Sequence, residues 1–205
     1  MSRHLLEVSA PAWRLALMSF AIVTGAVILI ALLIALQSTS LSSALIFKQF
    51  DEHWLIRSGR VEADRLVLQP SANSIGLALH PIDSSTFTLQ ARVAFDAAQS
   101  SGGLIVQADD PDHFTAFLIS GDGYFRVSDY RNGVWIDRAA WRAWPHIQRD
   151  GATNVLRAEC GSDRCTFFVN DEWTWQEQRV PATHAIGVLA NGTAEARFDQ
   201  IGWQP

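Results

Sequence analysis

The sequence predicts an all-β domain, an antiparallel sandwich or barrel, behind one N-terminal membrane-spanning helix. The helix is predicted by 22 uncharged residues, Leu15 to Leu36. The β domain is predicted by apolar side chains at every second position over residues 87–95, the period-2 pattern of a strand with one buried face. Turn signals recur along the rest of the chain, and no convincing helical period follows residue 50.

The apolar segment 15–36 is long enough to cross a membrane. At about 1.5 Å per residue it would measure about 33 Å, against a hydrocarbon core of about 30 Å. A secretory signal has a shorter apolar core and a small-residue cleavage site, and no clean Ala-x-Ala follows this one. We therefore expect a retained anchor in contact with membrane lipid. Ala21 and Gly25 would let another helix approach closely, although such small-residue pairs are also ordinary lipid-facing filler.

The orientation of the helix follows from its flanking charges. Two arginines lie in residues 1–14, and no lysine or arginine follows the helix until Lys48. The positive-inside rule places the N-terminus in the cytoplasm and the C-terminal bulk in the periplasm or the extracellular space. Residues 37–46 form a short linker to the domain at residues 47–205. So short a tether holds the domain against the membrane or against a neighbouring subunit.

Composition excludes one class of partner. The formal net charge is −5, so the chain has no basic footprint and nucleic acid is not an expected partner. Eleven phenylalanines and eight tryptophans against two methionines indicate a core packed with aromatic rings.

The two cysteines, Cys160 and Cys165, are flanked by the strand-like segments 154–160 and 165–170. They would face each other across a hairpin, at a Cα separation of about 4.5–5.5 Å that a disulfide can bridge. Outside the cytoplasm such a pair oxidises, so we predict a disulfide, with two free thiols as the alternative. Two cysteines without clustered histidines argue against a zinc site.

Further strands are predicted between turn signals. The run 114–119 is apolar on both faces and is expected to be a central strand. Asn132-Gly133 is a two-residue hairpin signal, and Gly121-Asp122-Gly123 separates two strands. Strands are expected at residues 61–68, 87–95, 103–107, 114–120, 124–130, 134–138, 154–160, 165–170, 185–190 and 195–203.

Several short motifs follow one another in an informative order. They are Phe50-Asp51 with Trp54, Ser101–Val106, Asp110–Val127, Gly133-Val134-Trp135, Asn154–Arg157, Phe167–Asn170, Gly187-Val188 and Arg197-Phe198-Asp199. In this order they resemble the concanavalin A-like, laminin-G-like jelly rolls, closest to the branch related to the 3-keto-disaccharide hydrolase-like domain. The resemblance implies two curved antiparallel sheets, one concave face and loops around its rim. Relatives of this kind bind glycans, cleave them or bind proteins, so function has to be argued from the site.

A catalytic site is not expected. Glucanases of this fold carry Glu-x-Asp-x-(x)-Glu on one strand, which places the catalytic carboxylates on one face. That pattern is absent, because Glu172 and Glu177 would point to opposite faces and Glu159 stands alone on its strand. Serine-hydrolase, zinc-protease and phosphate-loop motifs are absent as well. Glycoside hydrolysis is kept only as the last alternative.

Five residues are candidates for contact with a ligand or partner. Trp141, Arg142 and Trp144 lie in a predicted loop over residues 140–146, and Trp173 and Trp175 follow a predicted hairpin turn. An exposed tryptophan beside a charged group is suited to stacking on a sugar ring or anchoring a partner. Large aromatic residues in such loops also fold back to close the open end of a sandwich. The sequence leaves both interpretations open.

One metal site follows from the resemblance. Related sandwiches hold a structural calcium near the closing and first strands, which would bring Asp199 close to Asp51. No other cofactor is expected.

Two functions are consistent with these features. The first is a membrane-anchored extracytoplasmic module that recognises glycan or protein without catalysis. The second is an accessory subunit of a larger membrane complex, for example a respiratory or photosynthetic one, with its helix docked in the membrane and its sandwich on the outer face.

Overall fold

A computed structural model describes residues 46–47, 50–72, 74–178 and 184–205. The predicted helix lies outside the described residues, together with Ala21 and Gly25. Among the described residues, no helix has the length and apolar character needed to span a membrane. The strands are β1 (Ile46–Phe47), β2 (Leu55–Arg57), β3 (Gly59–Glu62), β4 (Arg65–Leu68), β5 (Ile75–Pro81), β6 (Phe87–Phe95), β7 (Ser101–Asp110), β8 (His113–Ser120), β9 (Tyr124–Arg131), β10 (Val134–Ala143), β11 (Asn154–Cys160), β12 (Arg164–Val169), β13 (Glu172–Gln178), β14 (Ala185–Asn191) and β15 (Ala196–Gln204).

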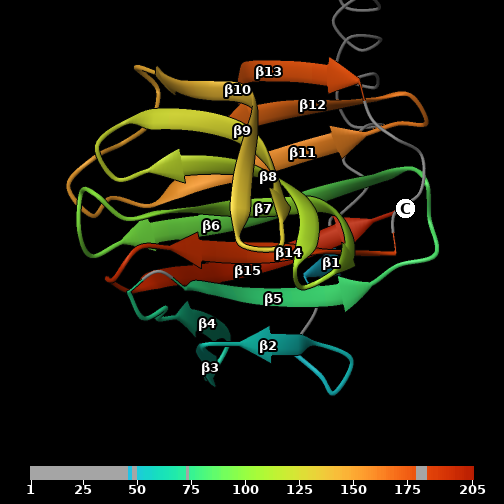
Figure 1. Cartoon of the computed structure of the whole chain (residues 1–205), viewed down its shortest axis with the longest axis horizontal. Helices are drawn as coiled ribbons and strands as arrows, with labels where there is room; N and C mark the ends of the chain where they lie inside the picture. The colour runs from blue at the N-terminus through green and yellow to red at the C-terminus, as the bar shows by residue number, and fades with distance from the viewer. Residues whose placement is uncertain (1–45, 48–49, 73, 179–183) are drawn as a thin grey trace, which may run out of the picture. The chain divides into compact units, whose positions relative to one another are not determined.

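The strands form two antiparallel sheets that pack face to face (Figure 1). Sheet A has the order β13-β12-β11-β6-β15-β4-β3, and β1 pairs with β15. Sheet B has the order β10-β9-β8-β7-β14-β5-β2. Many neighbours are distant in sequence, such as β6 with β15 and β7 with β14. The predicted antiparallel sandwich is therefore confirmed.

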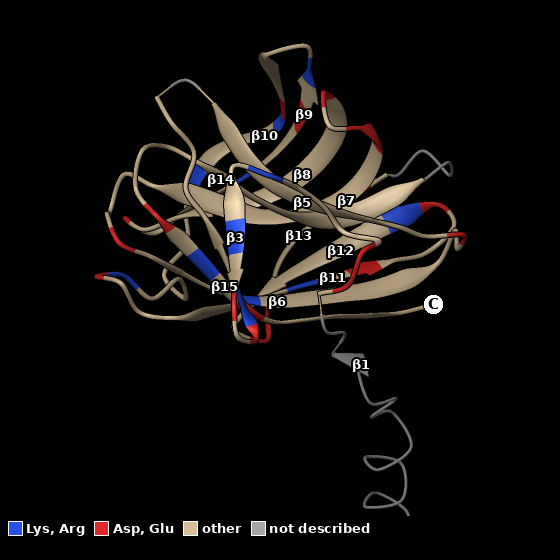
Figure 2. Ribbon diagram, turned by 90° about the horizontal axis from the view of Figure 1, so that it is seen from below, with Lys and Arg blue, Asp and Glu red and all other residues tan. Residues whose placement is uncertain are grey.

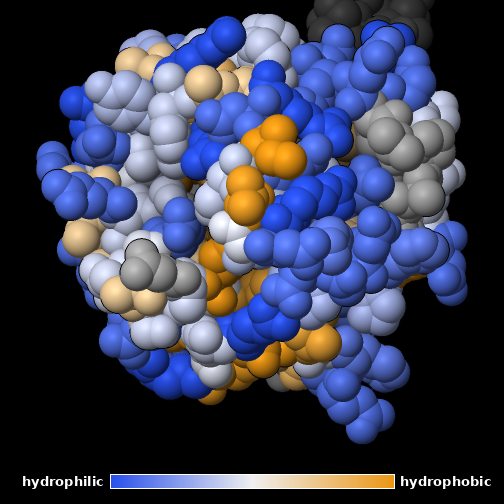
Figure 3. All heavy atoms as spheres, in the orientation of Figure 1, coloured by the Kyte–Doolittle hydropathy of each residue, from blue (hydrophilic) through white to orange (hydrophobic). Residues whose placement is uncertain are grey.

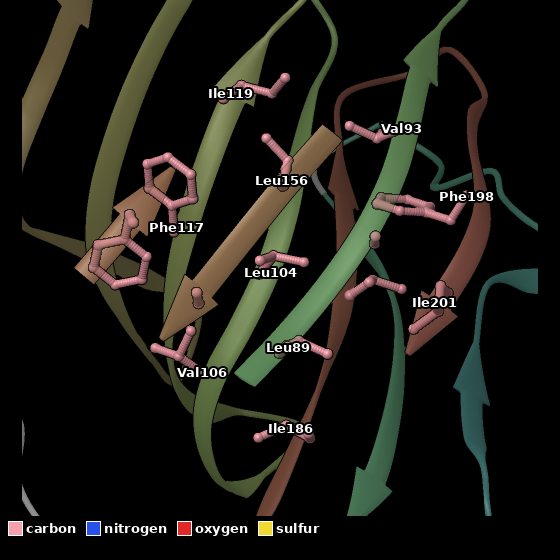
Figure 4. Packing of buried hydrophobic residues seen from close by; sticks show 14 of the residues in the cluster. Leu89, Val93, Leu104, Val106, Phe117, Ile119, Leu156, Ile186, Phe198 and Ile201 are labelled. Atoms are coloured by element: carbon pink, nitrogen blue, oxygen red, sulfur yellow. The ribbon is translucent and has the colours of Figure 1, made fainter. Parts of the chain in front are cut away.

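The main core lies between the two sheets. Along residues 87–95 the apolar side chains are buried and the polar ones are less so, as the period-2 pattern predicts. Figure 4 shows side chains from both sheets meeting in this layer, among them Leu89 and Phe198 of sheet A and Leu104 and Phe117 of sheet B. Burial of this layer is the main source of stability of the sandwich.

Two local predictions are confirmed. The strand β8 is almost completely buried and lies between β7 and β9 inside sheet B, as expected for a central strand. Asn132 and Gly133 take φ angles of +49° and +88° between β9 and β10. Two consecutive positive φ angles match the right-handed twist of the flanking strands in a two-residue hairpin.

The predicted disulfide is also confirmed. Cys160 of β11 pairs directly with Cys165 of β12, their Cα atoms are 4.1 Å apart, and their sulfur atoms are bonded. Both side chains are buried at the edge of the main core. The bridge therefore joins two neighbouring strands of sheet A at their turn.

Two boundary predictions are wrong. The segment 61–68 is not one strand, because β3 and β4 form a hairpin that turns at Ala63 and Asp64, where Ala63 has a φ of +54°. The predicted loop at 140–146 begins later than expected, because β10 continues to Ala143. Irregular pairing with β9 lets β10 bend without ending.

Four strands were not predicted from the sequence: β1, β2, β5 and β13. The strand β1 has only two residues. The strand β5 has no alternation to detect, because its residues Gly76 to His80 are buried on both faces. The strand β13 reads as a polar segment, because it lies at the edge of sheet A and much of it is exposed. The strand β2 has only three residues, too few for a pattern.

Candidate functional site

Sheet B has a second apolar face, turned away from sheet A. Because side chains alternate along a strand, Leu77 and Leu79 of β5 point away from Ala78, which belongs to the main core. Buried residues gather on this outer face: Leu77, Leu79, Ile105, Ala108, Phe114, Ala116, Leu118 and Leu189. The outer face of an antiparallel sandwich is ordinarily polar. Part of the chain must therefore cover this one.

The cover comes from the β7–β8 and β9–β10 hairpins. The ring centroids of Phe114 and Tyr130 are 4.9 Å apart, and those of Tyr130 and Trp135 are 5.0 Å apart. The tip of the β7–β8 hairpin reaches the far edge of sheet B, where Arg57 donates to Asp112 at 3.0 Å. In Figure 2 the ribbons of β8 and β9 curve away from sheet A. These contacts close one end of the outer face.

A groove remains open at the other end of the same face. Its volume is about 430 Å³, within the range of about 300–1,000 Å³ that is common for small-ligand sites. The surface in the view of Figure 3 is mostly hydrophilic, with apolar side chains in the middle of the view and along its lower edge. The groove is lined by Gln99, Ser101, Ser120, Asp122, Tyr124, Arg126, Trp141 and Asn191.

The lining combines aromatic surface with groups that donate and accept hydrogen bonds. The side chain of Trp141 is 38% exposed. Asp122 accepts a hydrogen bond from the Ser120 hydroxyl at 2.5 Å, and the same hydroxyl oxygen accepts one from the Tyr124 backbone N–H at 3.1 Å. An indole beside amides, hydroxyls and a carboxylate can hold a polar ring-shaped ligand, with its flat face on the indole and its hydroxyls on the polar groups.

The structure separates the five residues predicted to contact a ligand. Only Trp141 lines the groove. The Arg142 guanidinium stacks on Trp175, 4.9 Å from the ring centroid, and both Trp144 and Trp175 pack against the main core. Trp173 is 54% exposed on β13 of sheet A. Trp144 and Trp175 thus close the sandwich, while ligand contact by Trp141 stays a prediction.

Other groove residues were missed by sequence reasoning. A signal existed for Tyr124 and Arg126, which alternate with the buried Phe125 and Val127 directly after a glycine turn. A row of polar residues on one face of such a strand is consistent with a ligand site as well as with a face exposed to solvent. Asn191 had no local signal, because it reaches the groove only through the pairing of β14 with β7.

A charged cluster joins the edge strands of the two sheets. Arg138 of β10 lies 3.0 Å from Asp129 and 3.4 Å from Glu177 of β13. Thr115 donates a hydrogen bond to Asp129 at 2.6 Å. Burial raises the pKa of Glu177 above its ordinary value, the charge of Arg138 acts in the opposite direction, and Asp129 adds to the rise.

Replacing Glu177 with glutamine is expected to remove a pH dependence of stability. The pKa of this carboxyl is raised in the folded chain above its ordinary value of 4.5. Between the pKa of the unfolded chain and the higher pKa of the folded chain, the folded state binds more protons than the unfolded state. The free energy of unfolding therefore falls as the pH rises through this range. The glutamine variant lacks this fall. Its stability relative to the wild type should increase between about pH 4 and about pH 7 in urea titrations.

Glu172→Gln is the matched control, because Glu172 lies on the same strand and is exposed. The difference in free energy of unfolding between Glu172→Gln and the wild type should be the same at about pH 4 and at about pH 7. A Glu177→Gln difference that is equally flat, or that shrinks with rising pH, contradicts the prediction.

The two aspartates predicted to bind calcium have other partners. Asp199 lies 3.5 Å from Arg92 and 3.9 Å from Arg65. Asp51 accepts a hydrogen bond from the backbone N–H of His53 at 3.0 Å, which lowers the pKa of this carboxyl. Within the described ranges, no three His, Cys, Asp or Glu residues gather as a metal site. The calcium ion stays a prediction, and the two arginines already supply positive charge at Asp199.

Comparisons with known proteins bear on the fold. No protein-family model and no curated protein matches the chain. A carbohydrate-binding module, CBM66 from Bacillus subtilis, is similar with a TM-score of 0.65 and 15% identity over 78% of this chain and 99% of that one. A functionally unknown protein from Saccharomyces cerevisiae has a TM-score of 0.54 and 17% identity over 74% of this chain and 94% of that one. The xylan β-1,4-xylosidase from Bacillus halodurans has a TM-score of 0.54 and 12% identity, covering 77% of this chain and 37% of the enzyme.

The likeness is one of fold. It confirms the β-sandwich jelly roll that the resemblance implied, and the branch named from the sequence stays a prediction. Because a binding module and an enzyme are both among the similar structures, the fold does not choose between binding and hydrolysis.

Proposed function

We propose that this chain is a non-catalytic glycan-binding module, held outside the cytoplasm by the predicted membrane helix at residues 15–36. The observation that carries the proposal is the groove of sheet B, where Trp141 stands beside amide, hydroxyl and carboxylate groups. Sugars offer a flat CH face to an aromatic ring and hydroxyl groups to polar side chains. The likeness in fold to the carbohydrate-binding module from Bacillus subtilis supports the proposal.

The carboxylates at the groove support binding rather than hydrolysis. Asp122 accepts a hydrogen bond from Ser120, and Asp137 accepts hydrogen bonds from Arg126 and Ser128. Glycoside hydrolysis ordinarily needs one carboxyl as acid and a second as base or nucleophile, flanking the same bond. Here both groups position neighbouring side chains, and the glucanase motif is absent from the sequence.

The test is glycan binding by the full-length protein in detergent micelles, first on an array of oligosaccharides and then by titration with the tightest ligand. Trp141→Ala is expected to weaken binding by about tenfold or more, the scale of an aromatic anchor at an interface. Trp173→Ala is the matched control, because it removes another exposed indole, one that lies on sheet A. It should leave the affinity unchanged.

Equal losses in the two variants would contradict the assignment of the groove. Absence of binding to every oligosaccharide, together with stoichiometric recovery of other subunits, would favour the accessory-subunit function instead. Thermal unfolding of each variant shows whether a loss of binding comes from a loss of folding.

A further inference from the structure

Arg126 lines the groove and is held there by two aromatic rings. Its guanidinium carbon lies 5.0 Å from the centroid of the Trp135 ring and 5.7 Å from that of Trp141. The Arg126 side chain is only 12% exposed. A guanidinium placed against indole faces in this way is attracted to them and loses its rotational freedom. Arg126 is therefore a fixed part of the groove.

The hydrogen bonds of Arg126 leave its terminal nitrogens for a ligand. Its Nε donates to Asp137 Oδ1 and to Ser128 Oγ, each at 2.5 Å, and Ser128 Oγ donates to the same Asp137 oxygen at 2.7 Å. In the described part of the chain, no hydrogen bond involves Nη1 or Nη2 of Arg126. Because Arg126 lines the groove, those N–H groups are donors for a ligand there.

The positive charge of Arg126 does not dominate the groove. Asp137 neutralises it at 2.5 Å, and Asp122 is the carboxylate of the lining. Arg149 lies beside Gly123 and, like Asp137, is not among the lining residues. The charged lining residues are thus one arginine and one aspartate, and Asp137 compensates the arginine, so a carboxylate or sulfate on a ligand would face Asp122 with no uncompensated cation among the lining residues.

We propose that Asp137 is a specificity-determining residue that makes the groove select neutral sugars over acidic ones. It cancels the charge of Arg126 while it leaves the terminal N–H donors free for hydroxyl or ring oxygens. This inference rests on the proposed function, because it assigns the ligand class of the same groove.

The experiment uses a matched pair of ligands. These are the neutral oligosaccharide that binds most tightly on the array, and the same oligosaccharide with its primary alcohols oxidised to carboxylates. The full-length wild type in detergent should bind the oxidised ligand about tenfold more weakly at low salt, the scale of one unit charge at a partly buried site. Because ions screen exposed charges, the difference should shrink as salt is added.

Asp137→Asn is the decisive variant. Asparagine keeps an acceptor oxygen for Arg126 and Ser128 but removes the negative charge. The variant should bind the oxidised ligand about as tightly as the neutral one. Asp122→Asn should shift the ratio of the two affinities in the same direction. Asp163→Asn makes the same charge change at an exposed position in the Cys160–Cys165 turn and should leave the ratio unchanged.

The outcomes separate this inference from the proposed function. If the wild type binds both ligands equally, or prefers the oxidised one, the inference is overturned while glycan binding stands. The inference is also overturned if Asp137→Asn leaves the ratio of the affinities for the neutral and oxidised ligands unchanged. The same holds if Asp163→Asn changes this ratio as much as Asp137→Asn does. If no oligosaccharide binds the wild type more tightly than it binds the Trp141→Ala variant, the proposed function fails, and this inference fails with it.

Discussion

Replacing Phe117 with alanine is expected to lower the free energy of unfolding by about 4 kcal/mol, within the range for truncation of a buried phenylalanine. Phe117 lies on β8 and is fully buried between the sheets. Its ring stacks on Phe167 of sheet A, with centroids 4.7 Å apart and an interplanar angle of 18°. The variant leaves a cavity where the sheets meet, and two hydrogen-bonded sheets cannot collapse to fill it. Urea titration followed by tryptophan fluorescence measures the loss.

Phe168→Ala is the matched control. Phe168 follows Phe167 on β12 but faces outward, where it is partly buried under the Arg157 guanidinium, 4.0 Å from the ring centroid. Its truncation should cost about 1 kcal/mol. A loss as large as that of Phe117→Ala, or a loss below about 1 kcal/mol for Phe117→Ala itself, contradicts the packing described here.

Replacing Gly103 with alanine is the second large expected effect, because it should lower both the stability of sheet B and the affinity of the groove for glycan. A Cβ atom at Gly103 of β7 would lie 2.0 Å from the backbone oxygen of Phe117 on β8. The two strands would have to separate, at a cost of about 3 kcal/mol, the upper part of the range for overpacking. Two residues away, Ser101 pairs with Ser120, and both line the groove. Glycan affinity should therefore fall together with the unfolding midpoint.

Gly161→Ala is the same substitution at a position with room for it. The nearest atom to its added Cβ is the Arg164 backbone oxygen at 3.8 Å, an ordinary contact. We expect a change in stability within about 0.5 kcal/mol and an unchanged glycan affinity. If Gly103→Ala proved equally mild, the close approach of β7 to β8 would not be real.

The period-2 recurrence of apolar residues was sufficient to predict a strand where one face of the strand is buried and the other is not. The strand β6 shows this, because its alternation over residues 87–95 matches its burial residue by residue. The same rule failed for β5, whose outer residues Leu77 and Leu79 are covered by hairpins from elsewhere in sheet B. A local pattern cannot report a cover that comes from a distant part of the chain.

The candidate site could be predicted only in part for a related reason. Trp141 was selected as a tryptophan in a predicted loop beside a charged residue, and it lines the groove. Trp144 and Trp175 had the same appearance in the sequence, yet both pack against the core. Arg126 was missed because a single arginine on a strand is most often a solvated charge. Its importance comes from Trp135 and Asp137, which reach it through the pairing of β10 with β9.

Short-range chemistry therefore accounts for the alternating strand at residues 87–95, the turn at Asn132-Gly133 and the Cys160–Cys165 bridge, because each depends on residues that are neighbours in sequence or across one hairpin. The groove depends on something else. Its residues come from β7, β8, β9, β10 and β14 or the turns beside them, and the curvature of sheet B and the pairing of β14 with β7 bring them together. Long-range strand pairing is decided by how the whole chain buries its apolar faces, so a ligand site built across it emerges only in three dimensions.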